Sequence, residues 1–515
     1  MELPSIRLDL ASRNAVPRSC PVIVNPSTID FGDTPVGASA RNSLELINDG
    51  KEVAIGTLEV QGGFRLLSKS LCVLAPGEIR SVMVEFNPQK AGAFSGLLTF
   101  RGEHTTVSIL AARANRPAVL IAETGKPSGP LLPEIMIQGG GTSFQVEWPS
   151  EPGKEYQVWY SPDLANWTRA GTPVAARASV ASFVDDGSAT TPAPVAAPAR
   201  FYRVGDSNAA VVGFRRIELG ADTPLSVPFL KPIVAQGTIA SVAAKSLTVV
   251  NGGFRANQFR FNGGSQPLTY VLTIASGSQA GRWFVITGND ANVIQVDNLE
   301  GTIDLSQLLQ AGDLFIIHAL HRIADVFGPS NQPVLSRDDR IFLWDVSAQS
   351  YETPITLDVI PPESRLNWVQ DAKAVDNLPL FPGEGMLVKR NVPGKTAILL
   401  AGTVPFTPIL QEIVAGNNLV GQAFPVAFTV SRSDLLSSGF AGAQTFSASD
   451  KLYVFNARRS NFKSVLWFNT VLDRWVSPFT ELNPPQVELA PASAFFIQRN
   501  QVRGFEWIQK PLNGN

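Results

Sequence analysis

The hydrophobic positions of this chain fall in short runs that alternate with polar residues, and turn residues separate the runs. Runs at period two occur at 44–47, 144–148, 156–160 and 293–296, and no comparable stretch repeats at the helical period. Alternation of this kind is typical of strands that bury one face. We therefore predict an all-β, multidomain protein, with Ig-like β-sandwiches followed by a larger, duplicated β-sandwich or barrel-like region. One short helix is expected at 305–311, where Asp304 precedes an apolar run as an N-cap.

Changes in composition divide the chain into segments, and its length alone predicts three to five domains. Residues 116–133 are rich in Pro and Gly and form a predicted linker. The predicted segments are an N-terminal arm 1–19, an Ig-like domain 20–115, the linker 116–133, a small β-module 134–206, a β-rich domain 207–330, and two repeat units 331–409 and 410–515.

The C-terminal part contains an internal repeat. Residues 339–345 (DRIFLWD) match 450–456 (DKLYVFN), and 382–391 match 491–500, both ending in Arg-Asn. Trp368 and Trp475 also correspond, and a weaker echo joins 224–229 to 418–425. Duplicated β-units that share one core would explain these matches.

Three resemblances to known families rest on the motifs. The first domain carries Phe-Gly, Val-Gly, Asn-Asp-Gly, Pro-Gly and Phe-Asn-Pro at 31–32, 36–37, 48–50, 76–77 and 86–88. In these positions it resembles the Hydin-type (ASH) immunoglobulin-like domain, which implies a module that joins or displays. The frame at 156–168 with Phe-Tyr-Arg-Val at 201–204 resembles fibronectin-like modules of secreted bacterial proteins. Residues 211–509 resemble an uncharacterised, duplicated β-domain family of exported bacterial proteins, which implies no particular chemistry.

Charge and composition narrow the partners. The 515 residues carry a formal charge of -2, with a pI near 6.1, so no basic field attracts nucleic acid. Only 17% of residues are charged, against about 25% in typical soluble domains. Two explanations stay open: an uncharged extracellular surface, or a surface that neighbouring copies cover. No run of 18 apolar residues predicts a membrane span.

The start of the chain has an acidic residue and a proline where an export signal needs a basic and then an apolar region. The modules nevertheless resemble those of exported proteins. Either a leader preceded Met1 or export uses another route, and we expect an extracellular or cell-surface location. The cysteines are Cys20 and Cys72, which form a disulfide or remain two reduced, buried thiols.

Candidate chemistry is sparse. His318 and His321 could bind a metal only with a third ligand, and the alternative is a strand end. No motif for a phosphate loop or a nucleophile is present, so we expect no enzyme, no cofactor and no metal. Trp368 and Trp475 are candidate ligand-binding residues, because indoles can stack on sugar rings. The alternative for both is core packing.

These observations predict a non-enzymatic structural or adhesive protein that self-associates through edge strands and loops into a filament or surface layer. The alternative is a multimodular surface protein that binds carbohydrate or another ligand. An enzyme with an unrecognised site ranks last.

Overall fold

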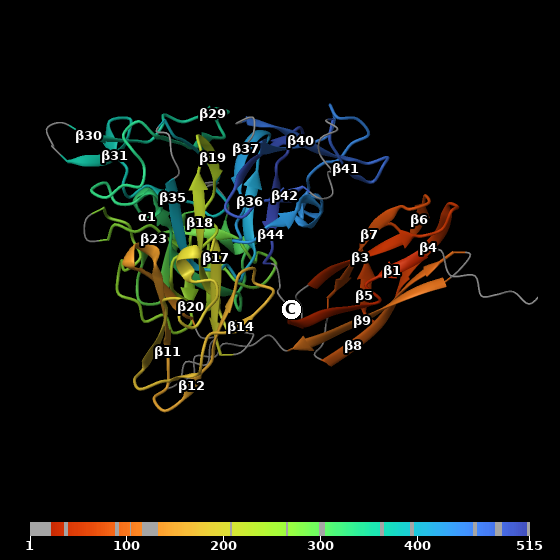
Figure 1. The fold of residues 1–515 in the computed structure, drawn as a ribbon, viewed down its shortest axis with the longest axis horizontal. Helices are drawn as coiled ribbons and strands as arrows, with labels where there is room; N and C mark the ends of the chain where they lie inside the picture. Colours follow the sequence, from red (N-terminus) through yellow and green to blue (C-terminus); the bar gives the residue numbers. More distant parts are fainter. Residues whose placement is uncertain are drawn as a thin grey trace, which may run out of the picture. The chain divides into compact units, whose positions relative to one another are not determined.

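The computed structural model describes residues 22–35, 40–87, 92–102, 105–115, 132–205, 209–263, 266–297, 304–360, 365–391, 396–456, 461–478 and 487–511. The chain divides into two compact units, Met1–Ile121 and Ala122–Asn515. Both consist almost entirely of strands (Figure 1), which confirms the predicted all-β, multidomain fold. The arm 1–19 and nearly all of the linker 116–133 lie outside the described residues.

Helices in the described residues are single turns. The α-helices are α1 (Ile323–Phe327) and α2 (Leu435–Ser438), and the 3₁₀ helices are Gly139–Gly141, Pro194–Ala196, Leu305–Gln307 and Val430–Arg432. The helix expected at 305–311 is therefore shorter than predicted. Its predicted cap is confirmed, because the Asp304 side chain accepts a hydrogen bond from the Ser306 backbone N–H at 2.9 Å. No helix among the described residues is both long enough and apolar enough to cross a membrane.

The first unit is a sandwich of two sheets. One sheet has the order β1-β3-β7-β5 and the other β2-β9-β8-β4-β6, with a parallel pair only between β2 and β9. Alternate residues of both sheets point inward around Leu46, Val84, Phe86 and Leu98. The strands are β1 (Val22–Asn25), β2 (Thr28–Pro35), β3 (Ala40–Asn48), β4 (Ala54–Val60), β5 (Phe64–Leu66), β6 (Leu71–Leu74), β7 (Ile79–Phe86), β8 (Gly92–Arg101) and β9 (Thr105–Asn115).

The second unit begins with a small β-module that is continuous with the rest of the unit. Its strands β14, β13 and β17 share a five-stranded sheet with β18 and β35, so the predicted segments 134–206, 207–330 and 331–409 contribute to one sheet. The module's strands are β10 (Glu134–Gln138), β11 (Ser143–Pro149), β12 (Glu155–Tyr156), β13 (Val158–Ser161), β14 (Thr168–Arg169), β15 (Val174–Ala175), β16 (Val180–Asp185) and β17 (Ala199–Val204).

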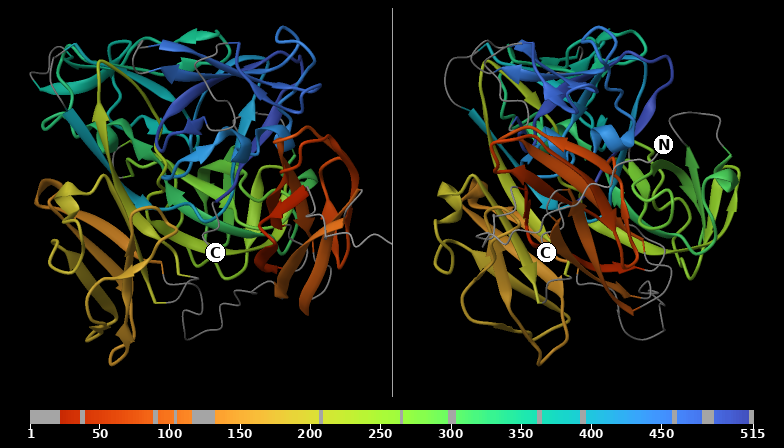
Figure 2. Two further views of the ribbon diagram at one scale, coloured as in Figure 1. Left: turned by 45° about the vertical axis from the view of Figure 1, so that its right-hand side comes forward. Right: turned by 90° about the vertical axis from the view of Figure 1, so that its right-hand side faces the viewer.

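A closed six-stranded barrel comes next, with the order β20-β21-β24-β23-β22-β25 (green in Figure 2). Aliphatic and phenylalanine side chains fill its interior, so the barrel is a packed core. Its strands are β20 (Ile233–Ala243), β21 (Ser246–Val249), β22 (Tyr270–Ile274), β23 (Trp283–Asn289), β24 (Val293–Asp297) and β25 (Leu314–Ala319).

The remaining strands form two copies of one arrangement. In the first copy β18 pairs with β35, β19 and β27 flank β34, and β26 pairs with β33; in the second, β36 pairs with β44, β37 and β39 flank β43, and β38 pairs with β42. The first copy comprises β18 (Val212–Leu219), β19 (Asp222–Leu225), β26 (His321–Arg322), β27 (Arg340–Phe342), β28 (Trp344–Asp345), β29 (Ser350–Tyr351), β30 (Thr356–Val359), β31 (Leu366–Gln370), β32 (Lys373–Ala374), β33 (Pro379–Leu380), β34 (Met386–Lys389) and β35 (Thr396–Thr403). The second comprises β36 (Ile409–Ile413), β37 (Gly416–Gly421), β38 (Phe428–Thr429), β39 (Lys451–Asn456), β40 (Asn461–Asn469), β41 (Arg474–Val476), β42 (Glu488–Leu489), β43 (Ala494–Arg499) and β44 (Phe505–Gln509).

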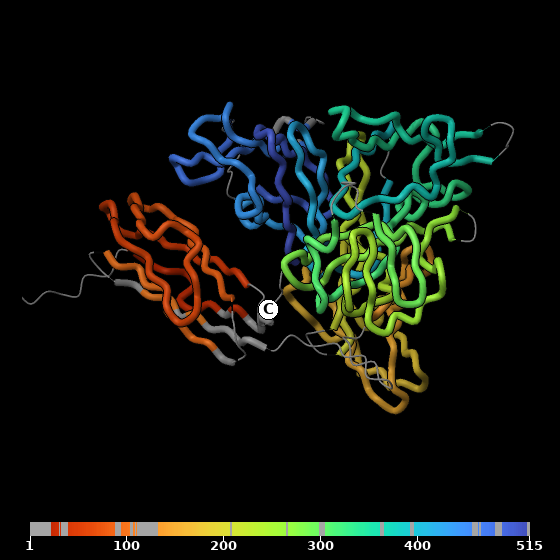
Figure 3. Tube along the Cα trace, turned by 180° about the vertical axis from the view of Figure 1, so that it is seen from behind, coloured from red at the N-terminus to blue at the C-terminus, as the bar shows by residue number. Residues whose placement is uncertain are grey.

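The register of these strands agrees with the repeat seen in the sequence. Ile341 lies opposite Val388, and their counterparts Leu452 and Ile497 lie opposite each other. The copies differ in one respect: in the first, the barrel is inserted between β19 and β26 (Figure 3). The first copy therefore includes β18 and β19, which precede the barrel and lie well before residue 331. Insertions are tolerated when they fall in a connection between strands, as the barrel does here.

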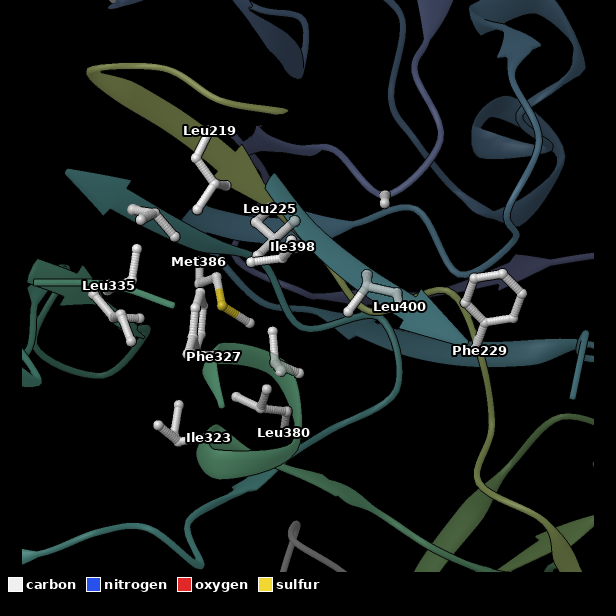
Figure 4. Close-up of a cluster of buried hydrophobic side chains, with 14 of the residues drawn as sticks. Leu219, Leu225, Phe229, Ile323, Phe327, Leu335, Leu380, Met386, Ile398 and Leu400 are labelled. Carbon is white, nitrogen blue, oxygen red and sulfur yellow. The ribbon is translucent and has the colours of Figure 1, made fainter. Parts of the chain in front are cut away.

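Reciprocal hydrogen bonds join the two copies. The Ser226 N–H donates to the Ala492 carbonyl at 2.9 Å, and the equivalent Gly421 N–H donates to the Gly383 carbonyl at 2.7 Å. This exchange is what an approximate twofold axis between the copies requires. Beside it, apolar side chains of β18, β19, α1, β34 and β35 pack into the largest core of the unit (Figure 4).

Candidate functional site

The outer face of the five-stranded sheet in the first unit carries exposed aliphatic side chains. Ile55 of β4 lies directly opposite Val73 of β6, and Leu71 lies opposite Thr57. Because alternate residues of a strand share a face, these side chains point away from the core, where Cys72 and Leu74 are buried. The exposed set, called here the aliphatic face, consists of Val53, Ile55, Leu71, Val73, Leu97 and Val107, which are 57, 60, 63, 43, 41 and 47% exposed.

An ion pair divides this face. Arg101 of β8 donates from Nε to the Glu59 carboxylate of β4 at 2.9 Å. Leu97 and Val107 lie on one side of this pair, and the other four residues lie toward the β6 edge of the sheet. The four edge residues therefore form one contiguous apolar patch on two neighbouring strands.

Asn48 fixes the loops beside this patch. Its side chain is fully buried, and Nδ2 donates to the carbonyls of Glu52, Leu74 and Ala75 at 2.8, 2.9 and 3.2 Å. Its Oδ1 accepts from the Gly50 N–H at 3.0 Å. One amide thus ties the loop before β4 to the end of β6, which explains why Asn-Asp-Gly stands at this point of the sequence.

The opposite face of the sandwich has a smaller apolar row. Ile23, Ile47 and Ile79 lie side by side across β1, β3 and β7, and Ile23 and Ile79 are 45 and 59% exposed. At the other end of the same face, Glu85 pairs with Arg41 at 2.9 Å and with Arg65 at 2.7 Å. Each sheet of the sandwich therefore presents an apolar region to solvent.

The tryptophans proposed as ligand-binding residues lie in hydrophobic cores. Trp368 is 1% exposed and Trp475 4% exposed, and the Trp368 indole N–H donates to the Gly328 carbonyl at 2.9 Å. A sugar could reach neither ring face without opening a core, so the structure favours the core-packing alternative for both. Of the two cysteines, Cys72 is buried in the sandwich core, whereas Cys20 lies outside the described residues, so their disulfide stays a prediction.

His318 and His321 both line one small pocket in the second unit, together with Phe229 and Phe381. The pocket has room for the centres of about one or two water molecules, too little for a substrate. Burial lowers the pKa of each imidazole to about 4, so both are neutral at physiological pH. Among the described residues, no three His, Cys, Asp or Glu side chains gather where they could hold a metal ion.

Nearby, burial raises the pKa of the Glu384 carboxyl to about 7. Its Oε2 accepts a hydrogen bond from the Phe381 N–H at 2.9 Å, which is a turn-capping contact. The equivalent residue of the second copy, Ser493, donates to the Ala490 carbonyl in the same turn. Glu384 therefore has a structural partner in the turn that it caps.

The aliphatic face was not singled out by the sequence analysis. Its signal was present at 71–74, where Leu-Cys-Val-Leu is apolar at every position although the strand belongs to a two-sheet sandwich with one solvated face. Both outward residues of this strand are apolar, whereas the neighbouring strand β4 has Thr57 and Glu59 at outward positions beside Ile55.

Comparisons with known proteins support the assignment of the first unit. Residues 21–107 match the model of the ASH family, described as "Abnormal spindle-like microcephaly-assoc'd, ASPM-SPD-2-Hydin". Similar solved structures include the ASH/PapD-like domain 7 of human CEP192, with 18% identity over 22% of this chain and 99% of that chain (TM-score 0.19), and the CupB2 chaperone of Pseudomonas aeruginosa, with 12% identity over 37% and 97% (TM-score 0.16). The Caenorhabditis elegans protein WR4 is 7% identical over 18% of this chain and 97% of that chain (TM-score 0.15). A search of curated proteins found no match. The chain thus contains an N-terminal ASH domain, which is not an enzymatic family and points to a protein-interaction or structural role.

Proposed function

We propose that this chain is a non-enzymatic structural or adhesive protein, extracellular or at the cell surface, whose ASH domain joins copies of the chain to one another. The observation that carries the proposal is the aliphatic face, six exposed aliphatic side chains on one sheet of a domain whose family points to a protein-interaction or structural role. Contiguous exposed apolar surface marks interaction sites in folded proteins.

The free energy gained by covering the aliphatic face can be compared with the free energy that association costs. Each of these side chains is about half exposed, so covering it contributes about 1 kcal/mol. A symmetric contact would cover the set twice and contribute on the order of 10 kcal/mol, comparable with the roughly 4–15 kcal/mol that association costs. Covering the face therefore offsets much of the cost of association, and the other contacts between the copies, backbone hydrogen bonds included, decide how tightly they bind.

Assembly into a filament or layer needs a second contact on the same domain. The row of Ile23, Ile47 and Ile79 on the opposite sheet supplies a separate apolar region. Two different contacts on opposite faces of one domain let copies add at both sides, which is the geometry of an open polymer. The low charge fraction of 17% fits a surface that neighbouring copies cover.

Sedimentation velocity of the full chain across a wide concentration range tests the proposal, together with electron microscopy of the same samples. We expect concentration-dependent species that Ile55→Glu weakens. The matched control is Val502→Glu, at a 97% exposed valine of the second unit, which should leave assembly unchanged. A native chain that stays monomeric at every concentration would refute the proposal. Labelling of intact cells with a membrane-impermeant reagent tests the location separately.

A further inference from the structure

The edge strand β6 has a free side with hydrogen-bonding groups aimed outward. It is the last strand of the sheet β2-β9-β8-β4-β6, and among the described residues it pairs with β4 alone. The Leu58 N–H donates to the Ser70 carbonyl at 2.7 Å, which makes this pair a hydrogen-bonded one. Hydrogen-bonded pairs alternate along an antiparallel ladder, so the backbone groups of Leu71 and Val73 point away from β4, toward the open edge.

The edge lacks the usual protection against pairing. Natural edge strands carry Lys or Pro, or are covered or bulged. β6 reads Leu-Cys-Val-Leu, with Leu71 and Val73 outward and exposed. These four residues are apolar and uncharged, with Lys69 and Pro76 outside them, and such an edge is a template for another strand.

We propose that β6 pairs with β6 of a second copy of this chain, antiparallel and centred on Cys72. This inference rests on the proposed self-association and names its contact. In this register Leu71 lies opposite Val73 of the other copy, and both are residues whose backbone groups face the edge. Four backbone hydrogen bonds form around the twofold axis, and the two sheets continue across it.

The side chains agree with the same register. Ile55 and Val73 of one copy continue into Leu71 and Thr57 of the other, so the exposed apolar rows join into one band. Lys69, an exposed residue just before β6, lies opposite Ala75 of the other copy. The Ala75 N–H donates to the Glu78 carboxylate at 2.8 Å, and Arg80 pairs with the same carboxylate at 2.7 Å, so this register places Lys69 beside an ion pair at each end. A shift of one residue would place hydrogen-bonding groups opposite residues that face β4.

The first test separates edge pairing from contact through the rest of the face. Val73→Lys places a charge on the edge, where natural proteins use lysine to prevent pairing. The matched control, Val107→Lys, changes a similarly exposed valine of β9, an internal strand of the same sheet. We expect Val73→Lys to weaken association of the full chain at least about tenfold, since the change occurs twice in a symmetric contact. Val107→Lys, on the same face but away from the edge, should weaken it less.

The second test reads the register directly. Residues in a hydrogen-bonded antiparallel pair have Cα atoms about 5.5 Å apart, a distance that a disulfide can span. An equimolar mixture of the Leu71→Cys and Val73→Cys chains should therefore form a covalent dimer under mild oxidation, whereas each variant alone should give only the background of the native protein.

The outcomes distinguish this inference from the proposed function. Association that persists in Val73→Lys, or cross-linking of Leu71→Cys with itself, would overturn the β6 pairing while self-association through another surface stands. Absence of association in the native chain would overturn both.

Discussion

Replacing Asn48 by alanine should destabilise the ASH sandwich selectively. The change removes the hydrogen bonds that Nδ2 shares among three carbonyls and the one bond that Oδ1 accepts, all at a fully buried side chain. Loss of a typical hydrogen bond costs about 1 kcal/mol, and a buried group left without a partner costs about 1–3 kcal/mol. We therefore expect the free energy of unfolding of this domain to fall by about 3–4 kcal/mol.

The distribution of tryptophans provides the assay. All nine tryptophans lie between residues 148 and 507, so indole fluorescence reports only on the second unit. Far-ultraviolet circular dichroism reports on the strands of both units. In urea titrations of the full chain, the unfolding of the first unit is therefore seen by circular dichroism and not by fluorescence. Asn48→Ala should shift that part of the dichroism transition to lower urea concentration. With a slope of about 1–2 kcal/mol per molar urea, the midpoint falls by about 1.5–4 M.

A matched substitution checks that the effect belongs to the buried amide. Asn42→Ala removes an exposed asparagine from the same strand, whose Oδ1 accepts the Ser43 N–H at 3.0 Å, and should change stability by no more than about 1 kcal/mol. A similar shift for both variants, or an equal shift of the fluorescence transition in Asn48→Ala, would refute the reasoning that Asn48 ties the loops of the first unit together.

Two further predictions concern the second unit. Asp450→Ala should destabilise it by about 3–5 kcal/mol, because Asp450 is fully buried, pairs with Arg499 at 2.6 Å and accepts the Asn500 N–H at 2.7 Å. Urea unfolding followed by indole fluorescence measures this change, and a loss of less than about 1 kcal/mol would contradict the prediction. His318 and His321 have folded pKa values near 4, below the ordinary 6.5, so the unfolded chain binds more protons and stability falls as pH drops from 6.5 toward 4. His321→Phe, which copies Phe428 of the second repeat, should remove about half of this acid sensitivity without loss at pH 7, and an unchanged pH profile would count against it.

Local pattern was enough to predict the strands and the repeat. Period-two alternation depends only on which side of a strand is buried, so the all-β fold could be inferred from single segments. The repeated Asp339 and Asp450 have the same physical role, because each accepts the backbone N–H of its Arg-Asn partner, Asn391 or Asn500, at 2.9 and 2.7 Å. In each repeat the buried carboxylate needs the backbone N–H that follows the arginine, so both the Asp segment and the Arg-Asn segment are constrained. This explains why the two repeats remain similar in sequence at these segments.

The continuity of the second unit could not be predicted from the sequence. The pairing of β18 with β35 joins residues 212–219 to 396–403, and the inserted barrel separates these strands along the chain. Pairing over such separations is set by the shared core and leaves no mark in a short window. The same limit applies to Trp368. Its strand, Leu-Asn-Trp-Val-Gln, does not show by itself what covers the indole, which packs beside Phe327 of α1.

The duplication also favours the ASH domain, over the repeats, as the place of the proposed contact with other copies. The two repeats contact each other through equivalent strand ends: the N–H groups of Ser226 and Gly421 each donate to a carbonyl of the other repeat. An isologous contact inside one chain satisfies the groups that would otherwise recruit a second chain. β6 of the sandwich, by contrast, has outward backbone groups and an apolar outer face with no strand beside it among the described residues. Unsatisfied edges drive pairing, so association should respond to charge at Val73 far more than to charge on the repeats.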